Sequence, residues 1–159
     1  MKHIIGISIF LIIGFSACNK QKTIYEKTIN FPNYQWNRFN IIEFSPEIKK
    51  LNKSYTFTLL LTYKESLPYE TLPVNIVLTY PSGQKNIIRH VFLIKKDNAY
   101  IGNKEGNLRH IEAVIHPDKI FSEEGLYTFS AQQLTQYYDL DYIVSVGCKV
   151  SYSSKKNKS

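Results

Sequence analysis

Cys18 is the residue of this chain whose surroundings define a reaction most clearly. The positive Lys2 precedes an apolar run from Ile4 to Phe15, and the small pair Ser16-Ala17 stands directly before Cys18. A basic start, a short apolar stretch and small residues form a secretory signal peptide. A cysteine directly after the small pair is typical of a lipoprotein signal. We therefore predict that residues 1–17 are cleaved and that Cys18 becomes an acylated N-terminus.

Two other interpretations of the N-terminus remain open: an uncleaved anchor helix, and an ordinary secretory signal with an incidental cysteine. The apolar run is shorter than the ~20 residues that span a bilayer, which favours cleavage. Residues 18–23 then form the lipidated cysteine and a short polar tether. The domain is therefore predicted to sit close to the membrane.

Three histidines, His90, His110 and His116, are candidates for metal ligands. His110 and His116 are six residues apart in a segment that reads as a strand, and an even spacing would place both on one face with Glu112. A zinc site needs three or four ligands, and no thiol or close ligand pair accompanies these residues. We therefore predict no metal and no cofactor, and histidines that are at the surface or hydrogen-bonded.

Carboxylate pairs are the second candidate for chemistry. Glu123-Glu124 stands before a glycine and is typical of a turn, whereas Asp139 and Asp141 alternate and could share a face of a strand. The chain has no Gly-x-Ser-x-Gly elbow, no His-Glu-x-x-His and no phosphate-binding glycine loop. Cys148 is the other cysteine and is predicted to be a buried free thiol. We predict that the protein is not an enzyme.

Aromatic residues are abundant, with 12 Tyr, 9 Phe and one Trp. Exposed rings can stack on sugars, whereas tyrosines of a β-sandwich more often pack their rings in the core and leave the hydroxyl at its rim. Both interpretations stay open, with core packing favoured. The candidates for sugar stacking are Tyr34, Trp36, Tyr100, Tyr137 and Tyr138.

The formal net charge is +7, and the lysines are scattered apart from two groups. One group is Lys49-Lys50 with Lys53, and the other lies in the C-terminal segment 153–159, which we predict to be a basic disordered tail. Scattered charge and export across a membrane argue against nucleic acid as a partner. A basic face against anionic lipid is compatible with a tethered protein.

Residues 24–152 are predicted to form one all-β domain, a jelly-roll-like β-sandwich. Apolar residues alternate with period two in Tyr55–Tyr63 and Val74–Tyr80, and both segments are rich in β-branched and aromatic residues. Pro81-Ser82-Gly83 predicts a turn, so residues 74–94 form a hairpin. Further strands are predicted at Gly125–Ala131 and Tyr142–Tyr152, while Asn107–Ile115 fits a strand or a helix equally well.

Several fragments, read in order, resemble gliding-motility lipoproteins of the GldH type from Bacteroidetes. The resemblance covers nearly the whole chain after Cys18, with two departures: no Arg follows Leu61-Thr62-Tyr63, and no Met-Arg follows Gln132. The matching fragments are Ile24–Lys27, Phe31–Asn33, Trp36, Phe44, Tyr55, Leu59–Leu61, Tyr69, Leu72, Val74–Leu78, Pro81–Gly83, Tyr100–Gly102, Gly106, Gly125–Phe129, Leu140 and Val146-Gly147.

The resemblance implies a non-enzymatic lipoprotein that supports gliding and the linked type IX secretion apparatus beside other Gld lipoproteins. Its partners would be the bilayer, through acylated Cys18, and those proteins. For the contact surface we expect either the sheet edges or a face that carries Trp36 and the loop Tyr137-Tyr138. In that phylum an acidic cluster after the lipidated cysteine accompanies surface exposure. The non-acidic Asn19–Lys22 therefore favours the outer membrane, facing the periplasm. Alternatives are a glycan-binding lipoprotein of a polysaccharide-uptake system and, last, a hydrolase with an unrecognised site.

Overall fold

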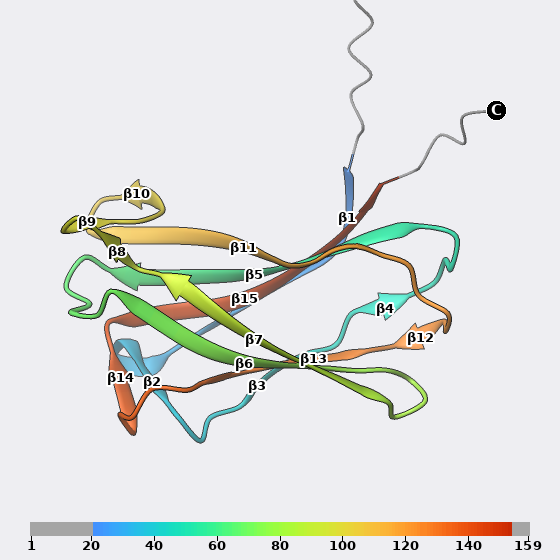
Figure 1. The fold of residues 1–159 in the computed structure, drawn as a ribbon, viewed down its shortest axis with the longest axis horizontal. Coiled ribbons are helices and arrows are strands. Elements are labelled where there is room, and N and C mark those ends of the chain that lie inside the picture. Colours follow the sequence, from blue (N-terminus) through green and yellow to red (C-terminus); the bar gives the residue numbers. More distant parts are fainter. Residues whose placement is uncertain (1–20, 154–159) are drawn as a thin grey trace, which may run out of the picture.

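The computed structural model of the protein describes residues 21–153 (Figure 1). The predicted signal peptide, the lipidation site Cys18 and residues 154–159 of the predicted tail lie outside the described residues.

The described chain is built from β-strands, with one short 3₁₀ turn, η1 (Pro32–Tyr34), near its start. The long strands carry β-branched and aromatic residues at alternate positions, which suit a pleated and half-buried surface. The strands are β1 (Gln21–Asn30), β2 (Gln35–Asn37), β3 (Ile42–Phe44), β4 (Glu47–Ile48), β5 (Ser54–Lys64), β6 (Thr71–Thr79), β7 (Lys85–Leu93), β8 (Lys95–Lys96), β9 (Ala99–Tyr100), β10 (Asn103–Glu105), β11 (Leu108–Lys119), β12 (Gly125–Leu126), β13 (Thr128–Gln133), β14 (Asp139–Asp141) and β15 (Ile143–Ser153).

Two antiparallel sheets pack face to face (Figure 1). One has the order β1-β15-β5-β11, extended by β10, and the other has the order β3-β13-β6-β7. Numbered along the chain, these eight strands run first-eighth-third-sixth and second-seventh-fourth-fifth. This interleaving is that of two Greek keys in a jelly roll. The prediction of an all-β, jelly-roll-like sandwich is confirmed.

The core lies between the two sheets and is formed by alternate residues of the strands. In β6 the side chains of Leu72, Val74, Ile76 and Leu78 are buried, and the intervening residues are partly exposed. Aromatic rings cluster in the interior around Phe121, whose ring lies 4.6–5.6 Å, centroid to centroid, from those of Tyr55, Phe57 and Tyr127. Offset and edge-on rings contribute beyond the area they bury.

Most of the predicted strands are confirmed. Tyr55–Tyr63 lies within β5, and residues 74–94 form the hairpin β6–β7, whose turn has a hydrogen bond of 2.8 Å from the Gly83 amide to the Tyr80 carbonyl oxygen. The ambiguous segment Asn107–Ile115 is a strand from Leu108 onward, as part of β11, and the last strand is β15.

Two boundaries differ from the sequence interpretation. Gly125–Ala131 is divided between two strands, β12 and β13, which are interrupted at Tyr127. The side chain of Tyr127 is fully buried, and its backbone amide donates a hydrogen bond to the carbonyl oxygen of Pro46, which lies outside both strand pairings. The predicted tether is shorter than residues 18–23, because β1 begins at Gln21, which pairs with Ser153 of β15. Ser153 is thus the end of a strand and not the start of the tail.

The first strand links two ends of the molecule. β1 starts where β15 ends and runs along the sheet to η1 and β2, which lie at the lower left of Figure 1 beside β14. Within residues 21–153 there is no helix long and apolar enough to cross a bilayer.

Candidate functional site

Two segments that are about 100 residues apart in the chain meet in a short ribbon at the lower left of Figure 1. β2 and β14 pair antiparallel, with Trp36 opposite Leu140. This pairing brings the segment that contains Trp36 next to the segment that contains Tyr137 and Tyr138. The ribbon therefore joins the residues that the sequence analysis selected for partner contact.

An exposed aromatic patch lies on the loops that leave this ribbon; we define it as Arg38, Phe39, Ile41, Tyr137 and Tyr138. Phe39 is 69% exposed and Tyr138 is 65% exposed, and their ring centroids are 5.7 Å apart. The Arg38 guanidinium carbon lies 5.8 Å from the centroid of each ring. The patch thus presents two large rings and a cation to solvent.

Hydrogen bonds hold the backbone of the patch in place. The Arg38 amide donates to the Tyr138 carbonyl oxygen over 2.7 Å, and the Phe39 amide donates to Asn37 Oδ1 over 2.9 Å. Asn37 Nδ2 in turn donates to Asp139 Oδ1 over 2.8 Å. These bonds order the backbone of the patch, and ordering before binding lowers the entropic cost of a contact.

Two glutamines at the end of β13 support the same loops. Gln132 Nε2 donates to the Arg38 carbonyl oxygen over 2.9 Å. Gln133 is buried, and its Nε2 donates to the Tyr137 carbonyl oxygen over 3.0 Å while its Oε1 accepts from the Thr135 amide over 2.8 Å. The side-chain amides of Gln132 and Gln133 thus fix the loops of the aromatic patch.

Trp36 does not lie on the surface, so the expectation of an exposed contact at this residue is wrong. Its side chain has no exposed area, stacks on Phe31 at 5.5 Å between centroids, and donates from Nε1 to the Asn40 carbonyl oxygen over 3.0 Å. The indole belongs to the same buried cluster as the residues between the two sheets. It supports the loop that exposes Phe39.

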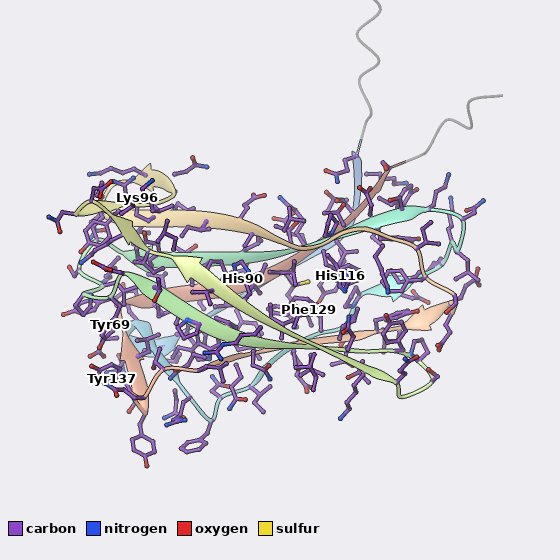
Figure 2. All side chains as sticks on the ribbon, in the orientation of Figure 1. Tyr69, His90, Lys96, His116, Phe129 and Tyr137 are labelled. Carbon is purple, nitrogen blue, oxygen red and sulfur yellow. The ribbon has the colours of Figure 1, made fainter. Side chains whose placement is uncertain are left out.

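Tyr137 and Tyr138 are both exposed, but to different degrees. Tyr137 is 41% exposed, and its ring lies 5.1 Å from that of Tyr69 (Figure 2). Tyr138 packs against Phe39 of the opposite loop and is open on its other side. Contact of these two tyrosines with a partner stays a prediction.

The other candidates for sugar stacking lie apart from the aromatic patch. The Tyr34 ring is covered by Lys64, whose Nζ lies 3.4 Å from the ring centroid. The Tyr100 hydroxyl donates to the Leu67 carbonyl oxygen over 3.3 Å, and its ring carries Lys95 Nζ at 4.6 Å. Both rings are engaged within the molecule.

The expectation that His110 and His116 share a face is wrong. The register of β11 against β5 shifts between Val114 and His116, and this bulge breaks the even spacing. His110 Nδ1 lies 3.0 Å from Thr62 Oγ1, whereas His116 Nε2 lies 3.0 Å from Asn86 Nδ2 of β7, in the other sheet. Figure 2 shows His116 and His90 between the two sheets.

The carboxylates bind polar side chains of other strands and turns. Asp141 accepts from Gln35 Nε2 over 2.7 Å, on the same face of β14 as Asp139, and the Glu123 carboxylate binds Ser82 in the β6–β7 turn. Glu112 pairs with Lys149. No group of three His, Cys, Asp or Glu side chains in residues 21–153 is placed to hold a metal ion.

Sequence reasoning missed Arg38, Phe39 and Ile41. Their signal is a break in period two: Asn37 and Asn40 flank Arg38-Phe39, and the run Ile41-Ile42 cannot be buried on one face. Ile42 is buried and Ile41 is 52% exposed, as this break requires.

Comparison with known proteins covers most of the domain. A family model described as GldH lipoprotein matches residues 23–150. None of the curated proteins matches the chain.

Proposed function

The chain belongs to the GldH lipoprotein family, and on this premise we propose that it is a lipid-anchored, non-enzymatic assembly factor for gliding motility and the linked type IX secretion apparatus. Acylated Cys18 is the anchor, and the protein faces the periplasm from the outer membrane. The domain acts by contact with other Gld-type lipoproteins or with proteins of the secretion apparatus.

The observation that carries the contact role is the aromatic patch. Tyr and Arg are enriched among the residues that dominate protein interfaces, and large exposed apolar groups clustered together are typical of interaction sites. In this protein Arg38, Phe39 and Tyr138 gather on two loops whose backbones are already hydrogen-bonded to each other. The patch supports a binding surface for a protein partner.

The position of the patch also supports this role. β1 begins at Gln21, three residues after Cys18, whereas the β2–β14 ribbon lies at the other end of β1 in Figure 1. An anchor at one end and a contact surface at the other leave the aromatic patch clear of the bilayer. Confinement to the membrane raises the effective concentration of the protein near membrane-bound partners.

The test is chemical crosslinking in native membranes followed by capture of the lipoprotein and identification of its partners. Tyr138→Ser removes an exposed ring from the aromatic patch, and Ile120→Ser is the matched control, since Ile120 is 61% exposed in the loop before β12. We expect Gld-type or secretion proteins with the wild type and Ile120→Ser, and their loss with Tyr138→Ser. Cys18→Ala should lose both the partners and the membrane association.

A glycan-binding lipoprotein is the alternative, and the exposed rings of Phe39 and Tyr138 are what favour it. These rings are tilted by 43° and do not form one flat platform for a sugar. Retention on a glycan array without capture of any protein partner would overturn the assembly role.

A further inference from the structure

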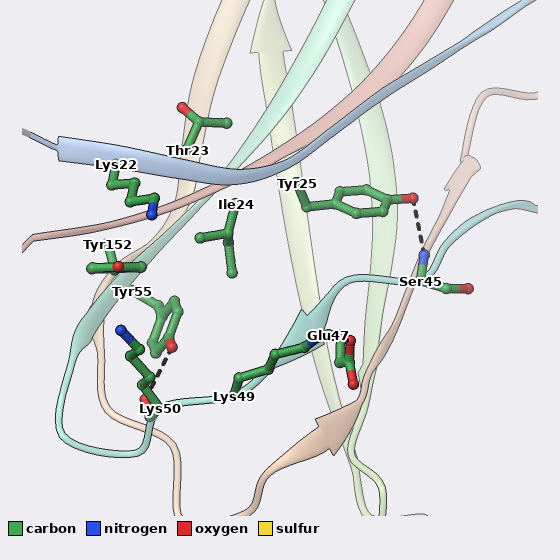
Figure 3. A pocket seen from close by; sticks show the side chains of 10 residues that line it. All are labelled: Lys22, Thr23, Ile24, Tyr25, Ser45, Glu47, Lys49, Lys50, Tyr55 and Tyr152. Carbon is green, nitrogen blue, oxygen red and sulfur yellow. Dashed lines mark hydrogen bonds and ion pairs between the residues drawn. The ribbon is translucent and has the colours of Figure 1, made fainter.

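An open pocket of about 580 Å³ lies beside the first residues of β1 (Figure 3). One wall is formed by β1 from Lys22 to Tyr25. The facing wall is formed by residues of the segment 45–50, which contains β4. Tyr55 and Tyr152 close the side between them. The pocket is separate from the aromatic patch and has no part in the contact role proposed above.

The pocket is basic. Of its charged groups, Lys49 Nζ and Glu47 Oε2 form an ion pair at 2.9 Å. Lys22 and Lys50 have no carboxylate within ion-pair distance among residues 21–153. Figure 3 shows the two side chains reaching from opposite walls toward the space beside Tyr55 and Tyr152. Two ammonium groups that face one concavity repel each other, and an anion between them removes that repulsion.

The remaining walls are shaped by tyrosines that are held in place. Tyr55 Oη donates to the Lys50 carbonyl oxygen over 3.0 Å, which fixes the loop that carries this lysine. Tyr25 Oη accepts from the Ser45 amide over 3.1 Å, so its own hydrogen remains to be donated. Ile24, which is 36% exposed, and the rings supply apolar surface beside these polar groups.

The pocket lies at the end of the domain from which the chain leads to Cys18. Gln21 is the third residue after Cys18, so the start of β1 stands at most about 11 Å from the anchor. Ser153 pairs with Gln21, and the sequence continues from Ser153 to Lys155, Lys156 and Lys158. The pocket mouth is thus tied within reach of lipid headgroups.

We propose that this pocket binds the phosphate headgroup of an anionic glycerophospholipid in the membrane to which the protein is anchored. Lys22 and Lys50 bind the phosphate oxygens, the Tyr25 hydroxyl donates to the headgroup, and Ile24 and the rings contact its glycerol carbons. This inference rests on the acyl anchor at Cys18 that is part of the proposed function. A bound headgroup sets the orientation of the domain on the membrane, which an acyl chain on a short tether does not.

The experiment uses the mature lipoprotein reconstituted into nanodiscs of phosphatidylcholine, with and without phosphatidylglycerol. Acetylation of each lysine is followed by mass spectrometry, and the mass of the N-terminal peptide reports acylation of Cys18. We expect phosphatidylglycerol to slow acetylation of Lys22 and Lys50 about fivefold each and to leave Lys96 at the far end unchanged (Figure 2).

The variants separate a pocket from general attraction to a charged surface. Lys22→Gln/Lys50→Gln and the charge-matched Lys85→Gln/Lys96→Gln each remove two positive charges, the second pair from β7 and β8. We expect the first variant to reduce the phosphatidylglycerol retained in native mass spectra about 25-fold and the second to leave it unchanged. An equal loss in both variants would overturn the pocket.

Two further outcomes identify the source and protect the test from the anchor. If inorganic phosphate or glycerol 3-phosphate alone protects Lys22 and Lys50 as well as phosphatidylglycerol does, the ligand is a soluble phosphate and the lipid assignment is wrong. An acylated protein without protection contradicts the pocket and leaves the anchor intact. An unacylated Cys18 with protected lysines contradicts the anchor and leaves the pocket intact.

Discussion

The buried Trp36 donates a hydrogen bond of 3.0 Å from Nε1 to the backbone carbonyl oxygen of Asn40. Asn40 closes the loop that exposes Arg38 and Phe39, and its own amide donates to the Asn37 carbonyl oxygen over 3.0 Å. The indole therefore connects the interior of the β2–β14 ribbon to the aromatic patch. Trp36 is buried and acts on the exposed rings as a positioning residue, through the backbone of this loop.

Replacement of Trp36 by Phe should test this connection. Trp36→Phe keeps an aromatic ring in the core but deletes the Nε1–H donor and leaves a small cavity, so the free energy of unfolding should fall by about 2 kcal/mol. Amide hydrogen exchange at Asn40 should accelerate, because its loop loses the bond to the indole. Phe129→Leu is the control: a comparable loss of stability with unchanged exchange at Asn40 is expected, and equal acceleration in both variants would contradict the positioning role.

Removal of the rings from the aromatic patch should affect binding and not folding. Phe39 is 69% exposed, so Phe39→Ser should change the free energy of unfolding by less than about 0.5 kcal/mol. Loss of a central aromatic contact should lower the affinity for the captured partner at least tenfold, as measured by titration with that partner. Ile120→Ser should alter neither quantity. An unchanged affinity for Phe39→Ser would exclude the patch as the contact surface.

The sandwich could be predicted from the sequence because its strands are buried on one face. In β6 every second residue is apolar, and a one-residue slip would expose all four of Leu72, Val74, Ile76 and Leu78. The hairpin turn carries its own signal in Pro81-Ser82-Gly83. Local pattern and global burial agree in these segments, so period two was sufficient.

The candidate site was harder to predict because its geometry is set by irregular backbone. The bulge after Val114 moves His116 from the expected face, and we find no residue type in β11 that predicts this bulge. A tryptophan side chain can lie at the surface or in the core. The sequence around Trp36 does not show that its ring stacks on Phe31 and that its Nε1–H donates to the Asn40 carbonyl oxygen within the molecule. Arg38 and Phe39 meet Tyr138 only because β2 pairs with β14, a contact about 100 residues apart in the chain.

Gly102 should tolerate no side chain. Its φ is +101°, and an added Cβ would lie 2.5 Å from the His110 carbonyl oxygen and 2.9 Å from Ile111 Cγ1. Backbone strain at a positive φ costs about 1–3 kcal/mol. Gly102→Ala should lower the free energy of unfolding by more than this amount, because the clash of the added Cβ comes in addition to the strain. Gly83→Ala is the control, because Gly83 also has a positive φ of +86° but an added Cβ there meets nothing within 4 Å. Urea unfolding should rank Gly102→Ala as the more damaging, and equal losses would refute the close approach.

Mild acid should destabilise the protein through the histidines between the sheets. Burial lowers the pKa of His90 and of His116 below the ordinary 6.5, and Lys119 adds to the effect at His116. The unfolded chain therefore binds more protons below this pH, so stability is present above about pH 6.5 and falls as the pH decreases through the folded-state pKa values. Thermal unfolding should show a lower Tm at pH 5.5 than at pH 7.5. His90→Gln/His116→Gln should flatten this dependence; an unchanged slope would contradict the assignment.

Cys148 lies in β15 with no exposed area, opposite Lys27 of the edge strand β1. Burial raises the pKa of its thiol from the ordinary 9.0 to about 12. The thiolate is the reactive form, so the folded protein holds this cysteine in an unreactive state. Since the unfolded chain ionises first, the stability from the neutral thiol is complete below pH 9.0 and is lost as the pH rises toward about 12.

The reactivity of Cys148 should therefore be measured by thiol titration in the native protein and in denaturant. In the native mature protein at about pH 8, Cys148 should react with a disulfide reagent about 10³-fold more slowly than in denaturant, because its thiolate is so rare. Lys27→Cys is the control, since this exposed position on the neighbouring strand should react at once in the folded state. The chain has two cysteines, so denatured wild type should show one thiol if the sulfur of Cys18 carries lipid and two if it does not. Fast native reaction of Cys148 would show that β1 leaves the sheet readily, and the edge of the sandwich would then be open.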